Sequence, residues 1–249
     1  MKFEDFGIII SQKKYGENSL VVKVFSKDHG IYRGFVKSVK SAKDRVIFQI
    51  GNQISFEFRA RDEESLGGFF AVDLMRSYCS KIIFDNLKLS CVKSLFALID
   101  DLFLEREEQQ KLFEKLQIFL QKISTEDHAA KSFLADYIRL ELKILKTLGY
   151  GVDLFSCVVT NSKTDLAFVS PKSARAVSFE AGKAYESKLL KLPNFLVEDA
   201  TDYDESHLLD GLKLSGFFLE KFLFSEKTFD QNQQKFFYRD NIRASLEGS

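Results

Sequence analysis

The chain contains few of the residues that mark special classes of protein. Its 249 residues include no Trp, 2 Pro and 3 Cys, and 36 Lys plus Arg balance 36 Asp plus Glu. The shortage of Pro excludes collagen-like and mucin-like chains, and a hydrophobic fraction of 45% is too high for intrinsic disorder. No apolar run approaches the roughly 18 residues of a membrane helix, and the acidic first residues do not resemble a signal peptide. We therefore expect a soluble globular protein.

The cysteines are Cys79, Cys91 and Cys157. An odd number at such wide spacing offers neither a disulfide framework nor a Cys-x-x-Cys metal knuckle. A single Cys in an apolar stretch, such as Cys157, is typical of a protein core. The pattern predicts a reducing compartment, the cytoplasm.

The net charge of zero conceals an asymmetry along the chain. Residues 1–61 hold 12 basic against 6 acidic side chains, a net charge of +6, so residues 62–249 hold 24 against 30, a net charge of −6. Most of the excess lies in residues 11–45, where nine basic side chains face three acidic ones. A basic N-terminal part of this kind predicts a polyanionic partner such as nucleic acid.

Alternation of apolar and polar residues with a period of two, typical of half-buried strands, runs through the first 75 residues. We predict five short strands, at residues 6–11, 19–25, 31–37, 54–61 and 69–75. A turn-rich connection is expected over residues 13–18, and Gly34 suggests a bend or β-bulge inside the third strand. Without a helix long enough to cover a sheet, these strands favour a small closed or nearly closed barrel over residues 1–80.

After Tyr78 the apolar residues recur every three to four positions, which predicts packed amphipathic helices. The expected helices span residues 82–104, 109–123, 129–148, 178–190, 205–224 and 235–246. Residues 152–177 lose this periodicity and predict a loop-rich module with short strand-like pieces. The sequence therefore predicts an α+β fold, with a barrel at 1–80 and a helical domain at 81–249.

Two groups of short motifs carry a resemblance to a known family. The first group comprises GIII at residues 7–10, YGENSL at 15–20, FSKDHG at 25–30 and VKSVK at 36–40. The second comprises LGYGVDL at residues 148–154 and DLAFVSP at 165–171. In order and separation these stretches resemble the RecO family of bacterial DNA repair and recombination mediators, across nearly the whole chain.

The resemblance implies an N-terminal OB-fold barrel followed by a helical domain, and no enzymatic active site. It also implies binding of single-stranded DNA, with duplex DNA as a further partner, annealing of complementary strands, and a place at the nucleoid. The implied partners are RecR, the single-stranded DNA-binding protein SSB, and indirectly the RecA recombinase, which is loaded onto SSB-coated strands in the RecF pathway.

One departure from the family concerns zinc. Many relatives carry a zinc module with two Cys-x-x-Cys pairs in the region corresponding to residues 150–180, because tetrahedral zinc needs four close ligands. Here only Cys157 remains, with Thr160 three positions later, and His29, His128 and His207 lie outside the module. We predict no zinc and no other cofactor.

Lysines and arginines in strand ends and connections neutralise phosphates without reading bases, and exposed aromatic rings stack on unpaired bases. The predicted DNA-binding residues are Lys13, Lys14, Tyr15, Lys23, Phe25, Arg33, Lys37, Lys40, Lys43 and Arg45. For each cation the competing interpretation is a solvated surface residue. For Phe25 and Tyr15 it is a core position, since the chain uses 26 Phe as general filler.

A second predicted site concerns a protein partner. The acidic, Phe-ended tail of SSB needs a small apolar pocket beside a cation. Arg139, Lys143 and Lys146 recur at helical spacing and form a basic stripe beside Leu140 and Ile144. The competing interpretation is again a solvated helix face.

Two other functions remain open from the residues alone. An OB barrel that tracks phosphates could serve an RNA-binding or translation-associated factor, because phosphate contacts do not separate RNA from DNA. A hydrolase could use the acids of residues 105–128 with His128. The sequence has no Gly-x-Ser-x-Gly elbow, no P-loop and no Gly-x-Gly-x-x-Gly fingerprint to support an enzyme.

Overall fold

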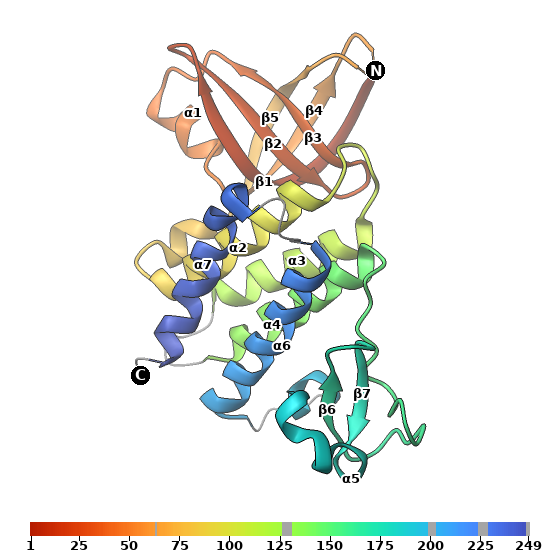
Figure 1. Ribbon diagram of the computed structural model, residues 1–249. Helices are drawn as coiled ribbons and strands as arrows, with labels where there is room; N and C mark the ends of the chain where they lie inside the picture. Colours follow the sequence, from red (N-terminus) through yellow and green to blue (C-terminus); the bar gives the residue numbers. More distant parts are fainter. Residues whose placement is uncertain (63, 126–130, 199–202, 224–228, 248–249) are drawn as a thin grey trace. The chain divides into compact units, whose positions relative to one another are not determined.

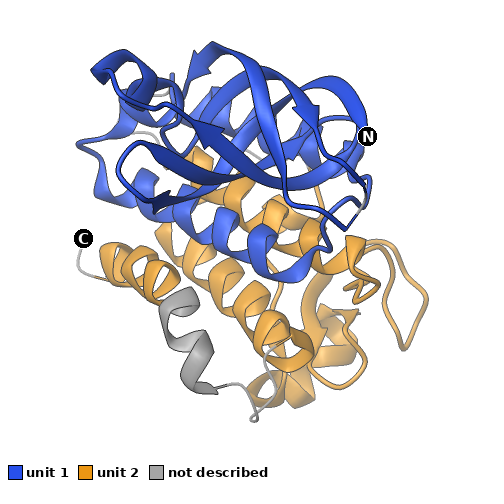
Figure 2. Cartoon of the chain, turned by 90° about the horizontal axis from the view of Figure 1, so that it is seen from above, with its two compact units in different colours: residues 1–126 blue, residues 127–249 orange. Residues whose placement is uncertain are grey.

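The structure is a computed structural model of residues 1–249. It describes all of them except residues 63, 126–130, 199–202, 224–228 and 248–249 and the side chains of 229–236. The chain forms two compact units, residues 1–126 and residues 127–249, which are coloured separately in Figure 2. Each unit is described by itself.

The first unit begins with a closed barrel of five strands (Figure 1). The strands are β1 (Lys2–Tyr15), β2 (Ser19–Ser26), β3 (Gly30–Lys37), β4 (Asn52–Arg59) and β5 (Gly67–Ser77). Their order around the barrel is β1-β2-β3-β5-β4, with every pair antiparallel except the β3–β5 pair that closes it. The predicted α+β class and five-stranded OB-fold barrel are confirmed.

Apolar side chains that alternate with polar ones along the strands fill the interior of the barrel. Val22, Val24, Ile54 and Phe58 belong to one apolar cluster and are 0% exposed. Strand β1 is longer than predicted, because Lys14 pairs with Leu20 and Tyr15 pairs with Ser19. Residues 13–15, which we expected in a turn, therefore continue the strand and carry their side chains to alternate faces.

Gly34 lies where β3 pairs with β5 to close the barrel, and of the expected bend or bulge at this residue the bulge is wrong, because its pairing with β2 has no register shift. The register shifts lie in the β1–β2 and β4–β5 pairings instead. Gly34 pairs with Gly67 of the parallel strand β5, and a Cβ atom on Gly34 would lie 2.9 Å from the Phe69 ring and 3.0 Å from the Gly67 carbonyl oxygen. The two strands approach closely only because this side chain is absent.

A short helix, α1 (Ala42–Ile47), was not predicted. Ser41 and Asp44 form a capping box at its start, in which each side chain accepts the backbone N–H of the other residue. Val39 and Phe48, on either side of the helix, join the apolar cluster of the barrel. The helix and its flanks thus supply side chains that pack with the strands.

The rest of the first unit comprises the 3₁₀ turn η1 (Cys79–Ile82) and the helices α2 (Asn86–Leu102) and α3 (Gln110–Ile123). The helix predicted at residues 82–104 starts late, because the Asp85 side chain accepts the Lys88 N–H and caps α2. Between the helices the chain returns to the barrel, where the Arg106 N–H donates to the Ile31 carbonyl at 2.8 Å. The change of pattern at residue 80 falls inside this compact unit, and a domain boundary there stays a prediction.

The second unit is built on the helices α4 (Ser132–Thr147), α6 (Glu205–Leu223) and α7 (Phe229–Glu247). A small sheet of order β7-β6-β8 joins them, from β6 (Leu166–Ser170), β7 (Arg175–Ser178) and β8 (Leu190–Lys191). The single helix predicted at 178–190 is wrong, since α5 (Phe179–Gly182) passes into the 3₁₀ helix η2 (Lys183–Lys188), and η3 (Asn194–Leu196) follows β8. Across the described part of the chain, no helix is long and apolar enough to cross a membrane.

A buried polar network joins the three long helices of this unit. Glu141 of α4 is 0% exposed and accepts hydrogen bonds from Tyr137 at 2.6 Å and from Ser215 of α6 at 2.5 Å. The Arg239 guanidinium of α7 lies 2.9 Å from the same carboxylate. Burial opposes the charge on Arg239, but Glu141, together with Tyr137 and Glu220, outweighs it and raises the pKa of the guanidinium. Each buried charge is therefore paired, as a low-dielectric interior requires.

This network predicts that breaking the buried ion pair of α7 lowers the free energy of unfolding far more than breaking its exposed ion pair. Glu141→Gln and Arg239→Met each leave an uncompensated buried group, so we expect either change to lower the free energy of unfolding by about 3–5 kcal/mol. The matched control is Glu247→Gln, which breaks the exposed Arg243–Glu247 pair at 2.7 Å and should change it by less than about 0.5 kcal/mol. Urea unfolding followed by circular dichroism measures all three, and a loss below about 1 kcal/mol at Glu141 contradicts the account.

Candidate nucleic-acid interface

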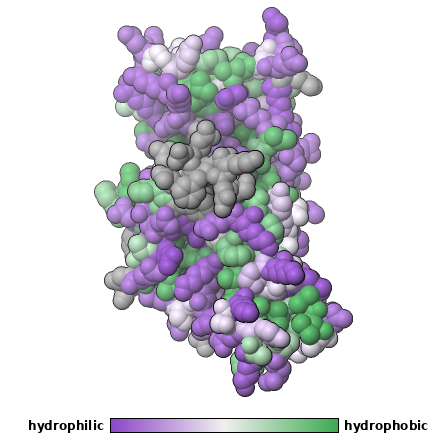
Figure 3. Space-filling model, in the orientation of Figure 1, coloured by the Kyte–Doolittle hydropathy of each residue, from purple (hydrophilic) through white to green (hydrophobic). Residues whose placement is uncertain are grey.

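Six exposed cations gather at one end of the barrel. They come from the end of β1, the end of β3 and the segment that contains α1, and the register brings the two strand ends together by pairing Tyr15 with Ser19 and Ser19 with Lys37. The six are Lys13, Lys14, Lys37, Lys40, Lys43 and Arg45. Among the described residues none of them has a carboxylate within ion-pair distance. In the view of Figure 3 hydrophilic side chains cover much of the barrel.

The outer face of this end combines charge with aromatic surface. Pairing places Lys13 opposite Val21 and Val21 opposite Phe35, while Tyr15 and Lys37 flank Ser19 on the same face. Tyr15 is 60% exposed, and its ring meets the Phe35 ring edge-on with centroids 5.2 Å apart. Periodicity alone did not single out Phe35, since its role depends on the register between strands.

The opposite face of the same strand opens into a groove at the barrel rim. Gln12 pairs with Val22 and Lys14 pairs with Leu20, so both side chains leave the sheet on the face that Leu20 and Val22 turn to the barrel core. The groove holds about 540 Å³ and is lined by Gln12, Lys14, Glu17, Ser19, Leu20, Val39, Arg45 and Gln49. Lys14 of β1 and Arg45 of α1 therefore share one concave surface, with Glu17 as its acidic member.

Two of the predicted cations are already neutralised within the first unit. Lys23 forms an ion pair with Asp100 of α2, and Arg33 lies 3.3 Å from Glu105. Both lie on the outer face, farther from the rim than Lys13 and Lys37. These ion pairs link the barrel to the segments that follow it. Lys23 is half-buried and the Arg33 side chain is 52% exposed, and contact of either residue with DNA stays a prediction.

The prediction that Phe25 stacks on a base is corrected by its burial. Its side chain is 0% exposed, and its ring packs edge-on against Phe113 of α3 with centroids 5.5 Å apart. A ring enclosed in this way offers no face to a base. Of the two predicted stacking residues, only Tyr15 remains in the candidate interface.

Lys40 and Lys43 lie in the short segment that leads into α1, and both are exposed. Their neighbour Asp44 is held by the capping box, where the Ser41 N–H lowers the pKa of its carboxyl group. Asp44 therefore remains an anion committed to the helix start. The geometry leaves the ammonium groups of both lysines open to solvent.

The basic stripe predicted on α4 is only partly free. The Arg139 guanidinium donates to the Phe195 carbonyl at 2.7 and 3.1 Å and to Asp136 at 2.8 Å. These bonds fix η3 to α4, and the pairing of Arg139 with a peptide carboxylate stays a prediction. Lys146 is exposed and its ammonium lies 5.7 Å from the centre of the Phe155 ring, whereas Lys143 is half-buried.

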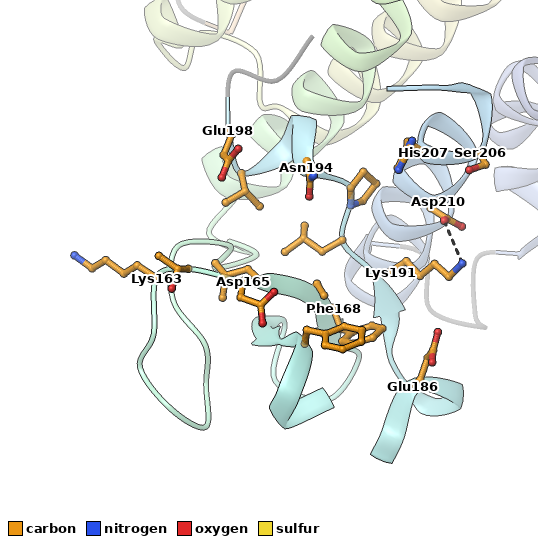
Figure 4. Close-up of a pocket in the computed structure, with 17 residues that line it drawn as sticks. Lys163, Asp165, Phe168, Glu186, Lys191, Asn194, Glu198, Ser206, His207 and Asp210 are labelled. Atoms are coloured by element: carbon orange, nitrogen blue, oxygen red, sulfur yellow. Dashed lines mark ion pairs between the residues drawn. The ribbon is translucent and has the colours of Figure 1, made fainter. Parts of the chain in front are cut away.

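A pocket of about 570 Å³ lies in the second unit between the small sheet and the start of α6 (Figure 4). Its floor includes Leu166 and Phe168, and an ion pair at 3.8 Å joins Lys191 to Asp210 at its side. His207, which also lines it, is paired with Asp204 at 2.9 Å. None of the residues that line this pocket belongs to the hydrolase alternative, which stays a hypothesis: Glu105 is paired with Arg33, and His128 lies outside the described residues.

Comparison with known proteins identifies the family. The family model described as Recombination protein O N terminal matches residues 1–78, and the one described as Recombination protein O C terminal matches residues 83–227. The chain belongs to the RecO family. It is 40% identical over 237 residues to a protein of Rickettsia conorii, covering 95% of this chain and 97% of that one. A relative from Rickettsia typhi is 39% identical over 225 residues, covering 90% and 92%. Both relatives are named DNA repair protein RecO.

The zinc module expected from the RecO resemblance does not fit the residues present. Within the described residues, no group of three or more His, Cys, Asp or Glu side chains is placed to hold a metal ion. At the expected place the Cys157 sulfur is 0% exposed and accepts N–H bonds from Val159, Thr160 and Ser178 at 3.3 to 3.4 Å. The Ser178 hydroxyl donates to it at 3.5 Å. Hydrogen-bond donors surround the sulfur in this module, and a zinc-free protein stays a prediction.

These donors change the acidity of the thiol. Burial opposes ionisation of Cys157, but the bonds from Ser178 and Thr160 outweigh it and lower the pKa of the thiol to about 6. Burial alone raises the pKa of Cys79 to about 11. Cys157 is therefore the thiol expected to ionise near neutral pH.

The Cys157 thiol gives a pH-dependent prediction. Because its pKa is about 6 in the folded chain and about 8.5 in an unfolded one, its stabilising contribution is complete above the unfolded value and is lost as the pH falls toward 6. The free energy of unfolding of the unaltered protein should thus rise with pH across this window, relative to Cys157→Ala. Thiolate absorbance in the native state checks the titration, with Cys91→Ala as control. Absence of a thiolate below pH 8 contradicts the pKa of about 6.

Proposed function

We propose that this protein acts in DNA repair as a recombination mediator that binds single-stranded DNA at the rim of its barrel. The observation that carries the proposal is the set of six exposed cations from β1, β3 and the α1 segment, none of which lies within ion-pair distance of a carboxylate of the described residues. Membership of the RecO family and the names of the Rickettsia relatives support a role in DNA repair. The proposed role involves no catalysis by the chain.

The chemistry of the rim suits annealing. Ammonium and guanidinium groups neutralise phosphates and release counterions without reading bases, so two complementary strands lose their mutual repulsion while their pairing edges stay free. With four to six phosphates contacted, the logarithm of affinity should fall with the logarithm of salt concentration with a slope of roughly −3 to −4. An RNA-binding role is the alternative, and the match over residues 83–227 favours repair over it.

The partners belong to the same proposal. We propose that the protein binds RecR and the acidic tail of SSB. Through these partners RecA is loaded onto SSB-coated strands, in the cytoplasm at the nucleoid. For the SSB tail the remaining cations are Lys143 and Lys146, because Arg139 is committed to the Phe195 carbonyl. We also propose that the module around Cys157 works without zinc.

Charge reversal at the rim tests DNA binding. Lys37→Glu with Lys40→Glu should weaken binding to an unstructured oligodeoxynucleotide by about tenfold or more, and the magnitude of the salt slope should fall by about 1.4 because two phosphate contacts are lost. Annealing of complementary SSB-coated strands should slow in parallel. The readouts are fluorescence anisotropy across a salt series and an annealing assay.

The control for this change is Lys172→Glu with Lys188→Glu, a reversal of equal charge at two exposed lysines of the second unit. If both double variants weaken binding equally, the effect comes from net charge and the rim is not the site. An equally strong preference for single-stranded RNA of the same sequence would favour the alternative function.

A peptide assay tests the tail site. Lys143→Ala with Lys146→Ala should weaken binding of an acidic, Phe-ended peptide by about tenfold or more, because a charge-assisted hydrogen bond contributes about 1.5–3 kcal/mol and about 1.4 kcal/mol corresponds to a factor of ten. Circular dichroism should remain unchanged. Isothermal titration measures the affinity, and unchanged affinity in the folded double variant removes these lysines from the site.

A further inference from the structure

We propose that the barrel rim holds two single strands at once, one on each face of the β1 end. The inference rests on the proposed function and adds a stoichiometry and a spatial arrangement to it. Its starting point is that Lys13 and Lys14 are adjacent residues of an extended strand, so their side chains leave the sheet on opposite faces.

The register fixes which face each lysine serves. Lys13 lies across from Val21, which pairs with Phe35 on the outer face of the sheet. Lys14 lies across from Leu20, which pairs with Val36, a member of the barrel's apolar cluster. A single strand that follows one face therefore meets only one of these two lysines.

Each face has its own complement of groups. The outer face offers the ammonium groups of Lys13, two residues before Tyr15 on β1, and of Lys37, two strands away on β3. It also offers the exposed Tyr15 ring, which meets the Phe35 ring with centroids 5.2 Å apart. The two cations can bind phosphates, and an unpaired base can stack on the open face of the Tyr15 ring. A base inside a duplex has no free face for this contact.

The rim groove has a different character. It provides Lys14 and Arg45 as cations and Gln12 and Gln49 as amides within about 540 Å³, with Glu17 at its wall. Guanidinium binds phosphate through two parallel hydrogen bonds, and amides accept and donate to base edges or sugars. The absence of an aromatic side chain among the residues that line the groove distinguishes it from the outer face.

The position of the two faces explains why both are open at the same end. Strand β4 pairs with β1 only over residues 2–8, so residues 11–15 have β2 on one edge alone. On the outer face the region farther from the rim is occupied by Asp100, Glu105 and Phe113 of the same unit. Two strands held on either side of this projecting ribbon have an effective concentration in the millimolar range, which accelerates their pairing.

The test counts strands per chain. Oligothymidine of about eight nucleotides, within the site size of one OB fold, carries either a donor or an acceptor dye and cannot pair with itself. At protein concentrations well above the dissociation constant, titration should saturate at two oligonucleotides per chain, and energy transfer should appear between the dyes. Native mass spectrometry gives the same count for monomeric complexes.

Face-selective variants complete the experiment. Lys13→Glu with Lys37→Glu should leave only the groove site, and Lys14→Glu with Arg45→Glu should leave only the outer site. Each double variant should bind one oligonucleotide and lose the energy transfer. Its rate of annealing complementary strands should fall at least about tenfold further than the loss of DNA affinity in the same variant explains. The Gln versions of the same changes, with circular dichroism, separate these effects from misfolding.

The outcomes divide cleanly. Saturation at one oligonucleotide, or loss of all binding in either double variant, means that one strand wraps around the β1 edge and overturns the proposal while the proposed function stands. Absence of any binding by the unaltered protein overturns both.

Discussion

The pairing register of β1 with β2 and of β2 with β3 determines what the barrel presents to its surroundings. In an extended strand a shift of one residue moves every side chain to the other face. The observed register keeps Val22 and Val24 in the core, sends Lys13, Tyr15 and Lys37 outward, and aims Lys14 at the rim. Everything proposed about nucleic acid depends on this assignment of side chains to faces.

The same register explains why the open surface is confined to one end of the barrel. Toward the other end, Asp100 and Glu105 neutralise the two outward cations, and Phe113 covers the outward phenyl ring of Phe25. Acidic residues of the segments after the barrel thus pair with some of the basic side chains of the sheet, and the other basic side chains remain exposed. In the second unit Arg139 is likewise used within the fold, because its guanidinium donates a hydrogen bond to the Phe195 carbonyl. A basic residue in the sequence is therefore available for binding only where the fold supplies no partner for it.

Much of the architecture could be predicted from the sequence, because it depends on local periodicity. The alternation of residues 54–58 and the 3.6-residue pattern of residues 109–123 correspond to β4 and α3. The six-residue helix α1 was missed because it is too short to show a period, although Ser41 and Asp44 carried the capping signal. The prediction for residues 178–190 was right about helical turns and wrong about one continuous helix, because α5 gives way to the 3₁₀ helix η2 and the two end residues, Ser178 and Leu190, belong to β7 and β8.

The candidate site was less predictable, for a physical reason. Composition locates a basic segment, but the partners that neutralise Lys23 and Arg33 lie about 75 residues away in the chain. The value of Phe35 and the burial of Phe25 likewise depend on contacts between strands and helices. Pair interactions at long sequence separation leave no mark in a single sequence, whereas register and capping leave a partial one.

Chemical footprinting of lysines tests the central claim most directly. Acetylation of the free protein and of its complex with oligothymidine, read out by peptide mass spectrometry, reports the access to each ammonium group. The account predicts protection of Lys13, Lys14, Lys37, Lys40 and Lys43, with Lys172 and Lys188 unchanged. Protection confined to the second unit, with the rim lysines as reactive as in the free protein, would contradict it.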